Sequence, residues 1–326
     1  MSLRRRTVLT LAAASAGALP LLPRVAAAQA YPSRPVKILV GFTAGGATDI
    51  QARLMADALS ERLGQQFLVD NKPGASGNIA TDMVAKAAPD GYTLLQVVTP
   101  HVINPALYSN LPFDFARDIV PIVQAARLAY VVVVNPSLPV ATIPELIAYA
   151  KANPGKVNYG SAGPGTPQNI ACELFRMMTE VNLVHVPYKG GAPAVADLVS
   201  GHVQLIFAPV SEAIQQVKSG KLRALAVTTA APLDALPGVP PVGASVPGYE
   251  ASGFAGLGAP RGTPAEIIEL LNKQANAGLG DPKIQARIVE LGGTVVGGTP
   301  AAFAATLAEA SAKWAKVIQF AGIKAD

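Results

Sequence analysis

Cysteine and histidine are scarce in this chain, and their scarcity excludes two kinds of site. The single cysteine, Cys172, cannot form an intramolecular disulfide, and its apolar neighbours predict a buried small side chain. The three histidines, His101, His185 and His202, lie far apart in the sequence, and no second cysteine accompanies them. The sequence therefore contains no zinc-binding motif, and we expect neither a metal nor another cofactor.

Charged residues make up only 14% of the chain, and no run of basic residues marks a nucleic-acid interface. The formal net charge of +5 comes from 26 basic and 21 acidic residues. Four of the arginines, and no acidic residue, lie in the first 30 positions, so the remainder holds 22 basic and 21 acidic residues. This near balance argues against a nucleic-acid partner.

Catalytic motifs are missing as well. No turn reads Gly-x-Gly-x-x-Gly or ends in the Gly-Lys-Ser/Thr of a P-loop, and Gly74-Ala75-Ser76-Gly77-Asn78 lacks the last glycine of a nucleophile elbow. His185 lies in an apolar strand and is expected in the core, whereas His101 follows a strand and could face either a cleft or the core. We predict no catalytic residue and no enzyme, although a site assembled from distant residues is not excluded by the sequence.

The first 30 residues have the pattern of an export signal. Arg4-Arg5-Arg6 precedes an apolar, alanine-rich segment over residues 8–22 that is too short to cross a membrane, and Ala28-Gln29-Ala30 forms a small-x-small cleavage site. We expect cleavage after Ala30 and a periplasmic protein that begins at Tyr31. The paired arginines permit twin-arginine export, and the Sec route is equally open.

Strand and helix patterns alternate along the rest of the chain, which predicts an α/β fold of parallel sheets covered by helices. Eight apolar runs end near Val40, Asn71, Val98, Val134, Tyr159, Val186, Phe207 and Val227. Amphipathic segments between them cover residues 79–88, 144–152, 168–179, 192–199 and 211–218. The strands could form one large sheet or two smaller ones, and residues 135–139 and 252–262 would suit two crossings between lobes.

Helical segments follow residue 262, and their start signals are explicit. Thr263-Pro264-Ala265-Glu266 reads as a capping box, and Asp281-Pro282 and Thr299-Pro300 repeat a cap followed by proline. The last helix covers residues 303–320, with Trp314 on its apolar face as a core anchor.

Three polar, glycine-rich turns each lead from a predicted strand into a helix: residues 41–49, 71–78 and 160–169. Taken alone, the first could be an ordinary connection with Asp49 as helix N-cap. Glycines let the backbone approach a ligand, and free N–H groups at helix N-termini attract anions. Ligands of open α/β sheets bind beyond the carboxyl ends of the strands, so we interpret the turns as the wall of an anion-binding cleft.

Short motifs in order along the chain carry a family resemblance. They are residues 31–35 (Tyr-Pro-Ser-Arg-Pro), 42–49, 71–77, 89–94, 159–163, 186–193, 220–228 and 259–264. In this respect the chain resembles the Bug-type periplasmic solute receptors of the tripartite tricarboxylate transporter group. The resemblance implies a two-lobed Venus-flytrap, type II periplasmic-binding-protein fold with a parallel-rich sheet in each lobe. It places residues 31–129 and 255–326 in lobe one and residues 130–254 in lobe two.

The resemblance also implies a monomeric receptor that captures a small carboxylate and delivers it to membrane transporter subunits. The residues expected to bind the ligand are Phe42, Thr43, Ala44, Gly45, Gly46, Asp49, Gly74, Ser76, Gly77, Asn78, Thr99, His101, Ser161, Ala162, Gly163, Gly165, Thr166, Asn169 and Ala208. We expect the amides of Gly45, Gly46, Gly163 and Gly165 to hold the anion, more than Lys72 or Lys189.

The chain departs from the family pattern at three places. Asn169 stands where many members carry histidine, Ala208 follows Phe207 where an acidic or amide residue is frequent, and Gly253-Phe254 replaces a frequent tryptophan. These changes would reshape the pocket, so the sequence does not name the ligand. The competing functions are an exported hydrolase or lyase and a receptor used for sensing without a transporter.

Overall fold

The computed structural model describes residues 31–324. Residues 1–30, with the predicted export signal and its cleavage site, lie outside the described part, as do residues 325–326. Residues 34–326 group into one compact unit, which is described here by itself. Among the described residues, no helix combines the length and apolar character needed to cross a membrane.

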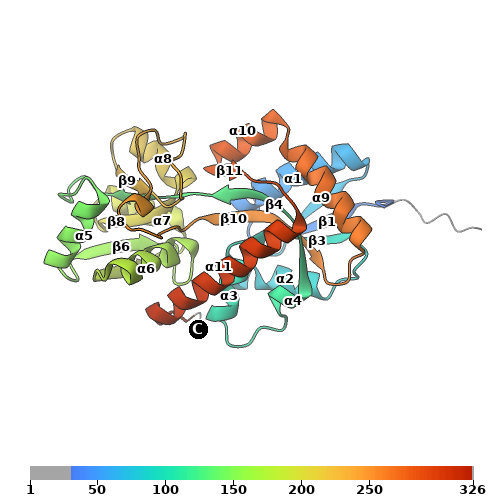
Figure 1. Cartoon of the computed structure of the whole chain (residues 1–326), viewed down its shortest axis with the longest axis horizontal. Helices are drawn as coiled ribbons and strands as arrows, with labels where there is room; N and C mark the ends of the chain where they lie inside the picture. Colours follow the sequence, from blue (N-terminus) through green and yellow to red (C-terminus); the bar gives the residue numbers. More distant parts are fainter. Residues whose placement is uncertain (1–30, 325–326) are drawn as a thin grey trace, which may run out of the picture. The chain divides into compact units, whose positions relative to one another are not determined.

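The first of two sheets has six strands in the order β11-β4-β10-β3-β1-β2 (Figure 1). Its strands are β1 (Val36–Val40), β2 (Phe67–Asn71), β3 (Thr93–Val98), β4 (Ile119–Leu128), β10 (Gly253–Pro260) and β11 (Gly293–Val295). β1 pairs in parallel with β2 and β3, whereas β10 and β11 pair antiparallel with their neighbours. The parallel side thus carries the first two glycine turns at one edge.

The second sheet has five strands in the order β7-β6-β8-β5-β9. They are β5 (Tyr130–Val134), β6 (Val157–Ser161), β7 (Leu183–Pro187), β8 (Leu205–Pro209) and β9 (Arg223–Val227). β6 pairs in parallel with β7 and β8, and β5 is antiparallel to β8 and β9. Both sheets therefore combine a parallel half with an antiparallel half.

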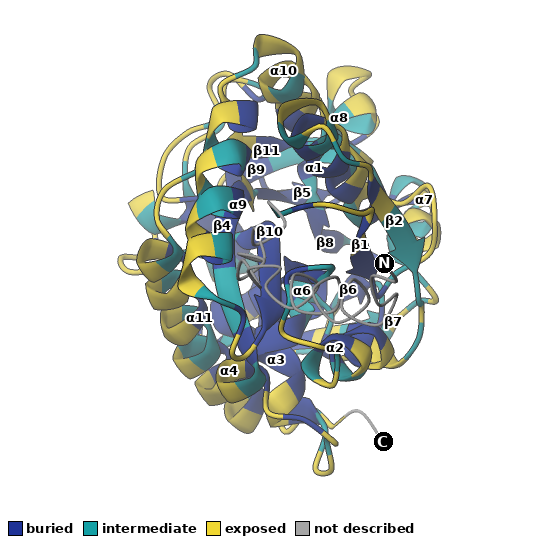
Figure 2. Cartoon of the chain, turned by 90° about the vertical axis from the view of Figure 1, so that its right-hand side faces the viewer, coloured by how far each residue is buried: buried dark blue, intermediate teal, exposed yellow. Residues whose placement is uncertain are grey.

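Helices cover both sheets, and exposed residues gather on their outer faces while the strands are largely buried (Figure 2). The helices are α1 (Ala47–Leu63), α2 (Asn78–Ala85), α3 (Pro100–Leu107), α4 (Phe115–Asp118), α5 (Ile143–Ala152), α6 (Pro167–Thr179), α7 (Gly191–Val199), α8 (Val210–Lys218), α9 (Ala265–Leu279), α10 (Pro282–Glu290) and α11 (Pro300–Ala321). Two 3₁₀ turns cover Ala75–Gly77 and Val242–Ala244.

Two of the three predicted caps are confirmed. Asp281 accepts the N–H of Lys283 at the start of α10, and Thr299 accepts the N–H of Ala302 at the start of α11. The predicted capping box at Thr263 is wrong, because its hydroxyl donates to Pro260 O and Pro264 is the N-cap of α9.

All eight predicted strands are present, but the sequence missed β4, β10 and β11. The segment 252–262, expected as a connection, contains β10, a fully buried strand between β3 and β4. Residues 135–139 are not a crossing, because β5 before them already belongs to the second sheet. The chain passes from the first sheet to the second at Ala129, between β4 and β5.

Ala129 forms main-chain hydrogen bonds with residues on both sides of this crossing. Its N–H donates to Gly292 O, next to β11, and its carbonyl accepts the N–H of Val210, which begins α8. The return crossing follows Ala251, whose N–H donates to Thr228 O, and reaches the first sheet where Gly253 pairs with Leu128.

One apolar cluster contains residues of both sheets and includes Phe207, Phe254 and Trp314. Cys172 and Trp314 are buried, as the sequence predicts. Helix α11 packs against α3 and β4 and also against α6, so it contacts the first sheet and a helix that packs on the second (Figure 1). Burial of these side chains supplies the main stabilisation of the fold.

Candidate functional site

The first two glycine turns lie beside each other at the carboxyl ends of neighbouring strands. Val40 and Asn71, the last residues of β1 and β2, are paired in register. The backbones then approach so closely that a Cβ on Gly41 would lie 2.4 Å from Gly77 Cα. Only glycine fits at this contact, which explains the residue type at position 41.

Asp49 holds the first turn in shape. Its carboxylate accepts the N–H of Gly45 at 2.9 Å, Arg53 Nε at 2.9 Å and Asn71 Nδ2 at 2.9 Å. Burial would raise the pKa of this carboxyl, but the hydrogen bonds from Arg53, Gly45 and Asn71 outweigh it and lower the pKa to about 2. The N-cap of α1 is Gly46, so the interpretation of Asp49 as N-cap is wrong.

The exposed part of this turn is its tip. Thr43, Ala44, Gly45 and Gly46 are exposed, and Phe42 is half-buried. Among the hydrogen bonds of the described residues, none uses the Gly46 N–H, which therefore stays available at the positive end of the α1 dipole.

The second turn has an unusual backbone. Gly74, Ala75, Ser76 and Gly77 all have positive φ, of 138°, 46°, 54° and 91°. Helix α3 holds this strained conformation: Asn104 Nδ2 donates to Ser76 O at 3.0 Å and to the Asn78 side chain at 2.7 Å. Backbone strain of this kind persists only where the surroundings enforce it, and it is concentrated at functional sites.

Ser76 is exposed, and its Oγ accepts the hydroxyl of Tyr108 at 3.3 Å. Lys72, one of two candidate cations, forms an ion pair with Asp70 at 3.0 Å. Lys189 is exposed and, among the described residues, has no ion pair within 4.0 Å.

His101 and Thr99 lie behind the second turn. His101 is only 2% exposed, stacks on Phe115, and its Nδ1 lies 2.9 Å from Val98 N. Burial lowers its pKa to about 4, so the imidazole is neutral at pH 7. Thr99 Oγ1 accepts the N–H of Phe254 at 3.0 Å, which ties the end of β3 to β10.

The third turn connects β6 to α6, and side chains of that segment accept its amides. Gly163 N–H donates to Ser161 Oγ at 3.0 Å, Gly165 N–H to Asn169 Oδ1 at 2.9 Å, and Ala162 N–H to Gln168 Oε1 at 2.9 Å. With Gly45, three of the four amides expected to bind an anion already have a partner. The expectation that these amides are free is therefore corrected for Gly45, Gly163 and Gly165.

Asn169 belongs to a buried polar chain. Its Nδ2 donates to Tyr159 Oη at 2.7 Å, Tyr159 donates in turn to Glu173, and Arg176 donates to both oxygens of Glu173 at 2.9 and 2.8 Å. Burial raises the pKa of Tyr159, and the neighbouring Cys172 and Glu173 raise it further. Each side chain in this polar chain is hydrogen-bonded to the next, although Arg176 Nε has no partner among the described residues, and these bonds fix the orientation of the Asn169 amide and hence the Gly165 turn.

Ser161 and His185 form a close pair, with Oγ 2.6 Å from Nε2. Ser161 is fully buried, and its hydroxyl also lies 3.1 Å from Gly163 O. His185 stacks on Tyr159 and is half-buried, and burial lowers its pKa. The enclosed hydroxyl makes this pair part of the turn rather than an accessible nucleophile.

The remaining predicted residues are half-buried or buried. Thr166 is half-buried, with Oγ1 donating to Gly163 O at 2.7 Å. Ala208 is fully buried in β8 and belongs to the apolar core of the second sheet. Asn78 is buried behind the second turn.

Helix α3 brings the third turn together with the first two. A Cβ on Gly165 would lie 2.4 Å from Leu107 Cδ1, and α3 also carries Asn104, which holds the second turn. Helix α3 thus contacts the second and third turns, and the first turn joins them through the close approach of Gly41 to Gly77.

Several polar groups at these turns were missed by the sequence analysis. They are Asn71, Asn104, Gln168 and Glu212, the last accepting Gln168 Nε2 at 3.1 Å. Asn71 and Gln168 lie inside the predicted turns and could have been weighed as turn-holding amides. Glu212 lies 44 residues beyond Gln168, and no local pattern indicates their contact.

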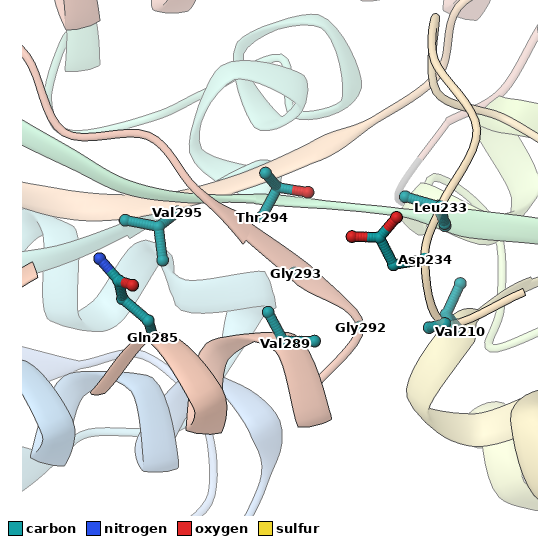
Figure 3. Close-up of a pocket in the computed structure, with 10 residues that line it drawn as sticks. Val210, Leu233, Asp234, Gln285, Val289, Gly292, Gly293, Thr294 and Val295 are labelled. Carbon is teal, nitrogen blue, oxygen red and sulfur yellow. The ribbon is translucent and has the colours of Figure 1, made fainter. Parts of the chain in front are cut away.

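A separate pocket of about 380 Å³ lies against β11, lined by Val210, Leu233, Asp234, Gln285, Val289, Gly292 and Thr294 among others (Figure 3). None of the predicted ligand-binding residues lines it. Among the described residues, no group of three or more His, Cys, Asp or Glu side chains could hold a metal ion.

Comparison with known proteins agrees with this architecture. The family model of the tripartite tricarboxylate transporter family receptors matches residues 51–323. Protein BugT of Bordetella pertussis is 35% identical over 300 residues, which cover 91% of this chain and 92% of BugT. The chain belongs to the tripartite tricarboxylate transporter receptor family.

Solved structures of this kind have the same fold. An R. palustris protein determined with adipate is 39% identical, with a TM-score of 0.78 over 90% of this chain and 99% of that one. MatC from Rhodopseudomonas palustris, determined with bound malate, is 29% identical, with a TM-score of 0.75 over 88% and 100%. The fold is the two-lobed α/β Venus flytrap of periplasmic binding proteins, and its family consists of solute receptors.

Proposed function

We propose that this protein is an exported receptor that captures a small carboxylate at the three glycine turns and delivers it to a tripartite tricarboxylate-type membrane transporter. Lobe one would comprise residues 31–129 and 255–326, and lobe two residues 130–254. The ligand would lie between them, and the receptor would act as a monomer.

The observation that carries the proposal is the meeting of the turns around α3. Gly165, in the turn that follows β6 of the second sheet, lies against Leu107, while Asn104 of the same helix holds the strained second turn. The adipate and malate in the two related structures support a carboxylate as the ligand class.

The anion would be bound by groups that the turns leave open. These are the Gly46 N–H, the first-turn amides of α1 and α6, and the hydroxyls of Thr43 and Ser76. The amides of Gly45, Gly163 and Gly165 would instead keep the turns in shape through Asp49, Ser161 and Asn169. Helix N-termini bind anions without a full positive charge, so no ion pair is required.

A thermal-shift screen of mono-, di- and tricarboxylates tests the proposal. A ligand at 100 times its dissociation constant should add about 2.7 kcal/mol to the free energy of unfolding. Native mass spectrometry of the protein as purified would identify a bound compound directly. Failure of every carboxylate to shift the transition would contradict the proposed function.

The second candidate is an exported hydrolase or lyase, and the Ser161–His185 pair is the observation that favours it. The burial of Ser161 argues against it, since a substrate carbonyl needs access to the nucleophile. Stoichiometric recovery of unchanged ligand would support the receptor, whereas turnover abolished by Ser161→Ala would support the enzyme. A third candidate, a receptor used only for sensing, would lack a transporter among the proteins it captures in a pull-down.

A further inference from the structure

Glu212 holds its carboxylate at the junction of three helix N-termini. It lies in the first turn of α8, just beyond the carboxyl end of β8. Its Oε2 accepts Gln168 Nε2 of α6 at 3.1 Å. The same oxygen lies against the first residue of α7, because a Cβ on Gly191 would be only 2.0 Å from it.

This carboxylate is linked directly to the third turn. Gln168 uses its Oε1 for the N–H of Ala162 and its Nε2 for Glu212, so one side chain bridges the turn and the acid. Glu212 also acts on Tyr130, the first residue beyond the crossing: burial raises the pKa of Tyr130, and the charge of Glu212 raises it further. Glu212 is therefore placed near both the third turn and the crossing between the sheets.

The Glu212 carboxylate accepts fewer hydrogen bonds than its two oxygens allow. Among the described residues, no Lys or Arg forms an ion pair with it, and its Oε1 has no hydrogen-bond partner. Residue 212 is exposed as a whole, yet desolvation of its carboxylate raises its pKa in spite of the Gln168 hydrogen bond. Its Oε1 thus lacks a donor that a ligand could supply.

A plain dicarboxylate would bring a second negative charge toward this acid, whereas an ammonium would complement it. We propose that Glu212 binds a donor group on the ligand, so that the receptor prefers a 2-amino dicarboxylate to the unsubstituted diacid. This inference rests on the proposed function and names the ligand class within it. A hydroxyl at the same carbon is a weaker, uncharged donor and should give intermediate affinity.

Calorimetry with succinate, malate and aspartate tests this directly, because the three share one skeleton and differ only in H, OH or NH₃⁺ at one carbon. Adipate and 2-aminoadipate provide the same comparison for a longer ligand. We expect the amino compound of at least one series to bind about tenfold or more tightly than its plain diacid, as for a charge-assisted hydrogen bond. Glu212→Gln retains the size of the side chain and should abolish that preference, mainly by weakening the amino compound.

Glu61→Gln is the matched control, since it removes the same charge from an exposed position on α1. It should leave the preference unchanged, and thermal unfolding of both variants should confirm that they fold. The inference is overturned if the wild type prefers the plain diacids, or if Glu212→Gln retains the preference for the amino compounds; binding of the diacids would then leave the proposed function intact. If none of the five compounds binds, the inference fails, and the proposed function is then decided by the wider screen of mono-, di- and tricarboxylates.

Discussion

Gly165 lies so close to Leu107 that a Cβ on the glycine would be 2.4 Å from Leu107 Cδ1. This contact joins a turn of the second sheet to a helix that follows a strand of the first. The glycine also has a φ of 70°, which L side chains rarely adopt.

Gly165→Ala should therefore destabilise the protein for two reasons. Left-handed φ costs an alanine about 1 kcal/mol, and the contact with Leu107 should add about 1–3 kcal/mol. Gly220→Ala is the matched control, because Gly220 has a φ of 73° and would place its Cβ within 4 Å of no other atom. Urea unfolding should show the larger loss for Gly165→Ala, and adding Leu107→Ala should reduce that difference. Equal losses for the two single variants would contradict the role of the contact.

Asn169→Ala should lower the stability of the protein, because the Asn169 side chain holds the third turn in shape. The substitution leaves the Gly165 N–H without its acceptor and removes the donor to Tyr159, so we expect a loss of about 1–3 kcal/mol in the free energy of unfolding. Carboxylate affinity should fall as well, because the turn loses its fixed shape. Asn110→Ala, at an exposed position, is the control in denaturant titrations; a similar effect of both variants would refute the argument.

Asp49→Asn should remove a pH-dependent contribution to stability. Hydrogen bonds lower the pKa of this buried carboxyl from 3.8 to about 2, so its folded form binds the proton less readily than the unfolded chain. The contribution is present above about pH 4 and is lost as the pH falls toward 2. We expect a deficit of about 1–2 kcal/mol at pH 7 that shrinks below pH 4. The exposed Asp234→Asn should show no such change, and a constant deficit down to pH 2 would count against the assignment.

Export should remove the first 30 residues. The basic and apolar segments followed by Ala28-Gln29-Ala30 predict a periplasmic form whose first residue is Tyr31. Intact mass and N-terminal analysis of protein from the periplasmic fraction would check this. A mature protein that retained Arg4 to Arg6 would disprove it.

The sequence predicted the strands with strong apolar runs and missed those with other compositions. β10 contains Gly256 and Gly258 because a Cβ on either would meet neighbouring atoms, 2.3 Å from Val123 O in the case of Gly256. The close fit between β10 and β4 thus removed the side chains that signal a strand. β4 is interrupted by Pro121, Gln124 and Arg127, and β11 has only three residues.

The positions of the three turns could be predicted because glycine and the flanking periodicity are local signals. The partners of their amides could not, since each acceptor depends on side-chain orientation fixed by tertiary contacts. Asn169 points at Gly165 because Tyr159 and Glu173 hold its other end. Glu212 reaches Gln168 only after β8 is inserted between β6 and β5.

The two bonds of Ala129 have a mechanical consequence. Its N–H donates to Gly292 O, next to β11 of the first sheet, and its carbonyl accepts the N–H of Val210, which follows β8 of the second sheet. The main-chain groups of this one residue are therefore hydrogen-bonded on both sides of the crossing. A rotation of one sheet against the other that kept both bonds would pivot at this crossing, whereas sliding would break at least one of them. The amide hydrogen of Ala129 should consequently exchange with solvent as slowly as those of the core strands.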